Sequence, residues 1–152
     1  MKKYMLNMKV TGNDRLHANY CLLRLTAEQI LPEMQPGQFV QVHVENSPTT
    51  FLRRPISINY VDREKNELWL LVQLVGDGTR KMATYKVGDI VNVLLPLGNG
   101  FTKPEAMTQS LLLIGGGVGT APLLYWGTVL KEMGCSPAFL LGARSKEDVL
   151  QR

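Results

Sequence analysis

The feature that most constrains the fold of this chain is a series of short strand-like segments separated by turn signals. Each segment carries alternating or continuous apolar residues, and Gly, Pro, Asn and Asp gather between the segments. Six such segments lie within the first hundred residues: residues 4–10, 20–25, 38–44, 51–59, 68–75 and 90–95. The cluster Thr11-Gly12-Asn13-Asp14 is expected to be the turn that ends the first of them. With almost no helical periodicity between them, these segments predict an antiparallel barrel or sandwich.

The order of predicted elements changes near residue 100. A short apolar strand, a run of glycines, a helix and a second apolar strand follow one another, at residues 111–114, 115–119, 120–133 and 138–141. This is the order of a parallel crossover unit, and Pro122 is tolerated because it falls in the first turn of the helix. We therefore expect two domains, an antiparallel one over residues 1–100 and a partial α/β one over residues 101–152.

Composition argues against several classes of function. The chain has 152 residues, a net charge of +4 and 45% hydrophobic residues, which is typical of a globular protein. Lys and Arg form no long run, so nucleic-acid binding is not expected. No segment is apolar enough to span a membrane and no secretory signal is evident, so we expect a cytoplasmic protein without a membrane partner. Cys21 and Cys135 form no metal-spaced pair, and we expect reduced thiols and no metal site.

The segment over residues 51–59 contains the most specific candidate site. Pro55 favours an extended backbone at Arg54, and Ile56-Ser57-Ile58 alternates as in a half-buried strand. Such a strand can present a cation and a hydroxyl on an apolar floor, which suits a planar, phosphate-bearing cofactor such as a flavin. We predict that Arg54 meets the pyrophosphate, that Ser57 hydrogen-bonds the ring edge, and that Pro55 and Ile56 lie against the ring. The alternative is an edge strand with two solvated arginines.

Two glycine-rich turns are candidate sites for an anion. In Gly76-Asp77-Gly78-Thr79 a strand leads into a turn, and we expect Thr79 to N-cap a short helix whose free N–H groups face a phosphate. The second turn, residues 115–122, follows a strand and opens a helix. Thr120, however, stands where a dinucleotide fingerprint has Gly or Ala, and no acidic residue is evident about 20 positions later. For both turns a purely structural role is the alternative.

Taken in order, these motifs resemble those of the ferredoxin-reductase superfamily. The matching segments are Pro36-Gly37-Gln38-Phe39, residues 53–58, residues 76–79 and residues 115–122. With Pro-Leu-Gly-Asn-Gly-Phe at residues 96–101, the chain is similar to the electron-transfer subunits of two-component, NAD-linked dihydroorotate dehydrogenases. The resemblance implies a six-stranded antiparallel Greek-key barrel that binds FAD, followed by the first βαβ unit of a Rossmann-like nicotinamide domain.

The resemblance also implies a set of cofactor-binding residues, with no catalytic residue among them. Gly78 and Thr79 are expected to join Arg54 at the flavin pyrophosphate. The segment Leu71-Val72-Gln73 is expected to border the flavin or its adenosine end, and the glycines of residues 115–119 to deliver NAD. The full set is Arg54, Pro55, Ile56, Ser57, Leu71, Val72, Gln73, Gly78, Thr79, Gly115, Gly117 and Gly119.

By the same resemblance the chain is an oxidoreductase subunit of pyrimidine biosynthesis. Members of that family pass electrons between NAD⁺ and the FMN of a partner dihydroorotate dehydrogenase catalytic subunit, through FAD and a [2Fe-2S] cluster. The cluster needs four closely spaced cysteine thiolates, and this chain has two cysteines. One crossover unit also supplies only two parallel strands, too few for a stable sheet. We therefore expect a C-terminally truncated member with an intact flavin domain, no cluster and an incomplete nicotinamide site.

Two other functions share these motifs. A standalone NAD(P)H-flavin reductase, or the reductase component of another electron-transfer complex, has the same pattern up to Pro122. The second alternative is a barrel that binds no flavin and acts only as a docking or regulatory module. A colourless purified protein is the observation that would favour this module.

Overall fold

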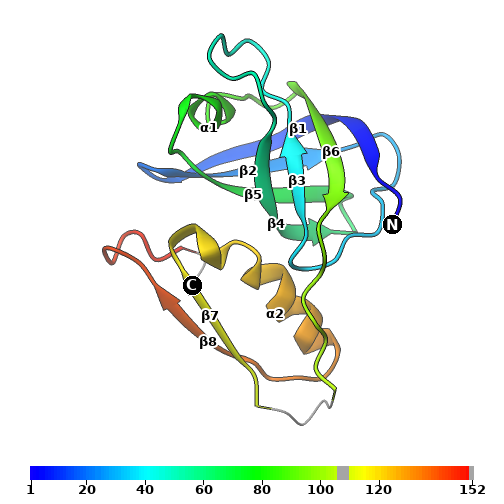
Figure 1. Cartoon of the computed structure of the whole chain (residues 1–152), viewed down its shortest axis with the longest axis vertical. Coiled ribbons are helices and arrows are strands. Elements are labelled where there is room, and N and C mark those ends of the chain that lie inside the picture. Colours follow the sequence, from blue (N-terminus) through cyan, green and yellow to red (C-terminus); the bar gives the residue numbers. More distant parts are fainter. Residues whose placement is uncertain (106–109, 151–152) are drawn as a thin grey trace.

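Six antiparallel strands close into a barrel, and a two-stranded parallel sheet with one helix follows it in the chain (Figure 1). This computed structural model describes residues 1–105 and 110–150. The barrel strands are β1 (Tyr4–His17), β2 (Tyr20–Thr26), β3 (Phe39–Val42), β4 (Arg54–Asp62), β5 (Glu67–Gln73) and β6 (Ile90–Leu97). A short helix, α1 (Asp77–Met82), lies between β5 and β6 in the chain.

The strand order around the barrel is β1-β2-β5-β4-β3-β6. All neighbouring pairs are antiparallel, and β6 closes the barrel by pairing with β1 from Tyr4 opposite Leu95 to Lys9 opposite Ile90. Because β2 lies beside β5 and β3 beside β6, the connections follow a Greek key and not a simple meander. The six-stranded Greek-key barrel is confirmed, and an open sandwich is excluded.

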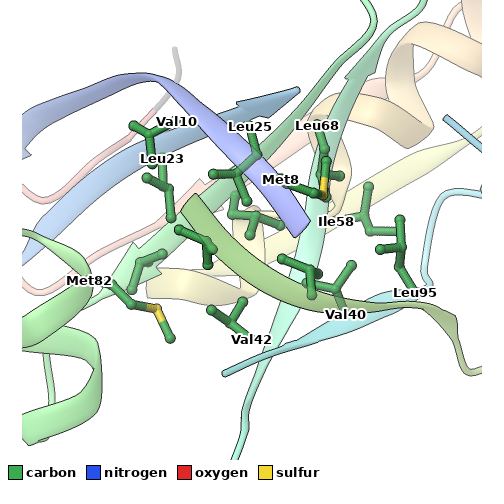
Figure 2. Packing of buried hydrophobic residues seen from close by; sticks show 14 of the residues in the cluster. Met8, Val10, Leu23, Leu25, Val40, Val42, Ile58, Leu68, Met82 and Leu95 are labelled. Atoms are coloured by element: carbon green, nitrogen blue, oxygen red, sulfur yellow. The ribbon is translucent and has the colours of Figure 1, made fainter. Parts of the chain in front are cut away.

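The barrel interior is filled by the inward-facing residues of all six strands (Figure 2). The alternation predicted from the sequence places them there, since successive side chains of a strand face opposite sides. Met82 of α1 packs into the same cluster. Residues without exposed surface in this core include Met8, Val10, Leu23, Leu25, Val40, Val42, Ile58, Leu68, Leu70, Val93 and Leu95.

The turn expected at residues 11–14 is wrong, because these residues continue β1. The register of β1 against β2 shifts between Val10 and Gly12, which is a β-bulge, and pairing then continues to His17 opposite Tyr20. Beyond the bulge, the side chains of Arg24 in β2 and Asp14 in β1 form an ion pair, with Nη2 and Oδ2 2.6 Å apart. The turn comes later, between His17 and Tyr20.

The second unit has the predicted parallel crossover order. It contains β7 (Leu112–Gly116), the 3-10 helix η1 (Gly117–Thr120), α2 (Leu123–Glu132) and β8 (Ala138–Gly142). β7 and β8 pair in parallel, from Leu112 opposite Ala138 to Gly116 opposite Gly142. The helix begins three residues later than predicted, because residues 117–120 form the 3-10 turn and Pro122 occupies the N-cap. None of the helices in the described ranges is long and apolar enough to cross a membrane.

The second unit packs on the outer face of the barrel beside β4. Tyr125 of α2 lies edge-on to Tyr60 of β4, with ring centroids 5.9 Å apart, and its hydroxyl donates to the carbonyl of Met34 at 2.9 Å. Tyr20, Leu71, Ala121 and Leu150 form a separate buried cluster. This packing brings the glycine run against the barrel strands that contain the predicted flavin residues. The division at residue 100 stays a prediction.

Candidate cofactor-binding site

The two arginines that precede Pro55 have different partners. Nη1 of Arg53 donates to the backbone carbonyls of Gln41 and Asn92, at 3.3 Å each, and Nη2 donates to the side-chain oxygen of Asn92. Arg53 therefore stabilises the barrel where β3 meets β6. Arg54 begins β4, and its Nε donates to the carbonyl of Leu52 at 3.2 Å. None of the ion pairs in the described part of the chain involves Arg54.

Arg54 lies directly against the first turn of α1. A Cβ added to Gly78 would meet Cγ and Cδ of Arg54 at 3.2 Å and Cγ2 of Thr50 at 2.9 Å. Only glycine fits at this position without displacing a neighbour. The contact places the aliphatic part of the Arg54 side chain, which carries a guanidinium at its end, against a glycine turn, a combination that suits an anionic ligand. The structure thus brings together Arg54 and Gly78, which the sequence placed in two separate motifs.

Thr79 shapes this turn from within. The prediction that Thr79 is the N-cap is wrong, because Gly76 holds that position and Thr79 is the third residue of α1. Its hydroxyl oxygen accepts from the N–H groups of Val75 (3.0 Å) and Gly76 (3.1 Å), and its hydroxyl donates to the carbonyl of Gly76 (3.0 Å). The side chain of Thr79 is therefore engaged with the backbone, and its role at a cofactor stays a prediction.

The side chains of β4 divide between the two faces of the barrel wall. Pro55 and Ser57 are exposed, whereas Ile56 is half-buried and packs against the core. The outer face of β4 thus presents the Pro55 ring and the Ser57 hydroxyl. Arg54, at the start of the strand, lies on the side of Ile56 and reaches the turn of α1. A flat ligand on this face would contact the side chains of Pro55 and Ser57, while the Ile56 side chain lies on the core side.

The segment Leu71-Val72-Gln73 of β5 meets three different environments. Val72 is fully buried in the barrel core, so its side chain cannot reach an outside ligand. Leu71 packs with Tyr20 and Ala121 beneath the second unit. Gln73 lines a cavity between the two units. Of the three predicted side chains, Gln73 is the one that faces open space.

The three predicted glycines of the second turn lie in different surroundings. A Cβ on Gly115 would lie 2.7 Å from Cδ1 of Leu123, so glycine allows the close packing of β7 against α2. Gly117 has φ +54°, a left-handed conformation that favours glycine. A Cβ on Gly119 would meet no atom within 4 Å. Gly119 therefore leaves open space at the loop surface, where a ligand can approach the backbone.

A cavity of about 720 Å³ is lined by residues of the barrel and of this glycine loop. This volume is typical of sites for small molecules and cofactors. Its lining includes Asn19, Tyr20, Gln73, Arg80, Gly117 and Arg144. Sequence reasoning missed Tyr20, Arg80 and Arg144. Arg144 carried a usable signal, because it follows the carboxyl end of a parallel strand, where ligands bind in α/β folds; Tyr20 carried none.

The two cysteines lie away from solvent. Burial raises the pKa of the Cys21 thiol to about 11, although the nearby Arg15 acts in the opposite direction. The thiol is therefore neutral near pH 7, which argues against a nucleophilic role. Cys135 is also buried, near the end of α2. Within the described ranges, no three His, Cys, Asp or Glu side chains come together as a metal site.

Comparisons with known proteins identify the relatives of this chain. It is 43% identical over 150 residues to the protein named dihydroorotate dehydrogenase B (NAD(+)), electron transfer subunit, of Shouchella clausii (strain KSM-K16). It is 40% identical over 144 residues to the protein of the same name from Bacillus cereus (strain Q1). The chain is a homologue of these subunits. The alignments cover 98% and 94% of the chain but 58% and 56% of the two relatives, and no protein-family model matches.

Solved structures share the fold. The Amycolatopsis cytochrome P450 reductase GcoB has a TM-score of 0.82 and 25% identity, over 96% of this chain and 45% of that protein. An NADH-dependent reduced ferredoxin-NADP oxidoreductase has a TM-score of 0.81 and 28% identity, over 97% and 51%. Phthalate dioxygenase reductase has a TM-score of 0.77 and 24% identity, over 95% and 46%. The resemblance to the ferredoxin-reductase fold is confirmed.

Proposed function

We propose that this chain is the flavin-binding part of an electron transfer subunit of dihydroorotate dehydrogenase B. In this proposal FAD lies on the outer face of the barrel, and electrons pass between NAD⁺ and the FMN of a partner catalytic subunit. The observation that carries it is the contact of Arg54 with Gly78 beside the exposed Pro55 and Ser57. The identity of 43% to a named electron transfer subunit supports the same conclusion.

The residues present fit FAD. The Arg54 guanidinium and the first turn of α1 would hold the pyrophosphate, with Gly78 leaving room for close approach. Pro55 would lie under the ring and Ser57 would hydrogen-bond its edge. When bound, the flavin supplies hydride and single-electron chemistry. The protein therefore needs no acid–base pair, and its residues bind and orient the cofactor.

The second unit supports a site for NAD beside the flavin. Gly117 of this loop lines the 720 Å³ cavity, and Gln73 lines the same cavity from the barrel side. A nicotinamide bound there would meet a flavin held on the adjoining barrel face. We assign residues 1–100 to the flavin domain and residues 101–152 to part of the nicotinamide domain.

A [2Fe-2S] cluster does not fit the residues of this chain. Such a cluster needs four thiolates, and the sequence contains Cys21 and Cys135 alone. Both are buried, one in the barrel wall and one after α2. No electron step is therefore assigned to a cluster held by this chain.

The proposal is tested by adding FAD to the purified chain and recording its visible absorption after gel filtration. We expect the wild-type chain to retain flavin. Arg54→Ala should weaken FAD binding about 10- to 100-fold, because a hydrogen bond to a charged group contributes about 1.5–3 kcal/mol. Lys9→Ala is the matched control, since it removes an exposed positive charge from β1, on the opposite side of the barrel from β4.

Two results would contradict the proposal. A folded wild-type chain that retains no flavin would favour the docking module. If Arg54→Ala and Lys9→Ala retain equal amounts of FAD, the FAD site does not include Arg54 at the start of β4. Co-purification with an FMN-containing dihydroorotate dehydrogenase catalytic subunit distinguishes the proposed role from that of a standalone flavin reductase, which needs no such partner.

A further inference from the structure

Asn59 is a fully buried polar side chain at the point where β4 meets the second unit. The register of β4 against β5 shifts between Ile58 and Tyr60, which is a β-bulge. Two residues, Asn59 and Tyr60, therefore separate the inward-facing Ile58 and Val61, where regular alternation would leave one. Such a bulge redirects side chains. Here Asn59 and Tyr60 both face the second unit, where Tyr60 meets the ring of Tyr125.

The amide of Asn59 holds the glycine loop. Its Nδ2 donates to the carbonyl of Ala121 at 2.6 Å, in a buried setting. Ala121 in turn donates its N–H to the carbonyl of Val118 at 3.0 Å, and Thr120 Oγ1 donates to the carbonyl of Gly117 at 2.9 Å. The loop is thus tied internally, and Asn59 attaches it to the barrel.

Under the proposed function β4 also holds the flavin, through Ser57, which lies two positions before Asn59. We propose that Asn59 is a positioning residue for electron transfer, which fixes the nicotinamide-binding loop relative to the flavin-binding strand. It touches neither cofactor and acts through Ala121 and the backbone of the loop. This inference rests on the proposed function and names the residue that couples its two cofactor sites.

Asn59→Leu tests this role in the 152-residue chain, because it conserves the size of the side chain and removes the donor. Flavin retention should be unchanged. The KM for NADH in flavin reduction should rise about 3- to 10-fold, with a smaller change in the limiting rate. Hydrogen exchange should show faster exchange of the Ala121 amide and its loop neighbours, while the barrel strands stay protected. Tyr125→Phe is the matched control, since it removes another hydrogen bond between the units without touching the loop.

Asn59→Asp adds a readout that packing alone would not produce. An ionised carboxylate offers no donor to the Ala121 carbonyl, whereas a protonated one offers an O–H. Burial favours the neutral form of the acid, so the donor returns as the pH falls. The KM for NADH of Asn59→Asp should therefore approach the wild-type value at lower pH, and that of Asn59→Leu should not.

The outcomes separate this inference from the proposed function. Retained flavin with wild-type KM and wild-type loop exchange in Asn59→Leu overturns the inference alone. Where NADH does not reduce the flavin of the wild-type chain, hydrogen exchange of the loop decides the question. Unchanged loop exchange in Asn59→Leu then overturns the inference, and faster loop exchange with a protected barrel supports it. Absence of flavin from the folded wild-type chain refutes the proposed function and the inference with it.

Discussion

Replacing Arg53 with alanine should destabilise the barrel, although its neighbour Arg54 can be replaced at little cost in stability. The Arg53 guanidinium donates to carbonyls of Gln41 in β3 and Asn92 in β6. The Asn92 amide donates in turn to the side chain of Asn7 in β1 at 2.7 Å. Removing Arg53 therefore breaks a network over three strands at the place where β3 ends.

The size of the effect follows from these contacts. A hydrogen bond from a charged donor contributes about 1.5–3 kcal/mol when it is well formed. Two contacts of Arg53 are long, at 3.3 Å, and the side chain is only half-buried. We therefore expect Arg53→Ala to lower the free energy of unfolding by about 1–3 kcal/mol in total, or the Tm by roughly 3–10 °C. Arg54→Ala loses one exposed contact and should stay within about 0.5 kcal/mol of wild type.

Thermal unfolding followed by circular dichroism, with and without FAD, measures both effects. A ligand that binds the folded state raises the Tm. Added FAD should therefore raise the Tm of wild type and of Arg53→Ala by similar amounts, and that of Arg54→Ala by much less. The reasoning is refuted if Arg53→Ala unfolds at the wild-type temperature, or if Arg54→Ala is the less stable of the two.

Two further predictions concern the glycine loop and the buried thiol. Gly117→Ala should cost roughly 1–2 kcal/mol of stability, because φ is +54° there; Gly119→Ala, whose Cβ meets no atom within 4 Å, is the control, and equal stabilities in urea titration would contradict the argument. Burial raises the pKa of Cys21 from 9.0 to about 11, so the folded chain holds this proton more tightly than the unfolded chain. The resulting stability is complete below about pH 9 and is lost as the pH rises through about 11. Cys21→Ala should lack this part of the pH dependence of unfolding, and an identical pH dependence in both proteins would refute the assignment.

The barrel could be predicted because alternation and turn composition are local properties of each strand. The strand ends could not. Thr11-Gly12-Asn13-Asp14 has the composition of a turn, yet β1 runs through it, because a bulge after Val10 allows pairing with β2 to continue. The N-cap of α1 could not be predicted either. Gly76 holds that position, and the hydroxyl oxygen of Thr79 accepts a hydrogen bond from its N–H.

The candidate site could be predicted only in part, because several of its residues depend on contacts between distant segments. Arg53 and Arg54 look alike in the sequence, and only the pairing of β3 with β6 gives them different partners. Asn59 reads as an ordinary outward-facing residue of a strand, and its partner lies 62 positions away. Arg80 and Arg144 share a cavity because two units meet there, which no local pattern records.

The closing contact of the barrel has a consequence for its synthesis. Tyr4 of β1 pairs with Leu95 of β6, so the first barrel strand is synthesised well before the last barrel strand, with which it must pair. At about 5–20 residues per second, this interval lasts on the order of 5–20 seconds. During it, β1 can pair with β2 but leaves its other edge open to foreign strands. Pairing between segments this far apart in sequence is also slow to form. We therefore expect nascent chains that stop before residue 90 to be far more prone to aggregate than those that extend past residue 97.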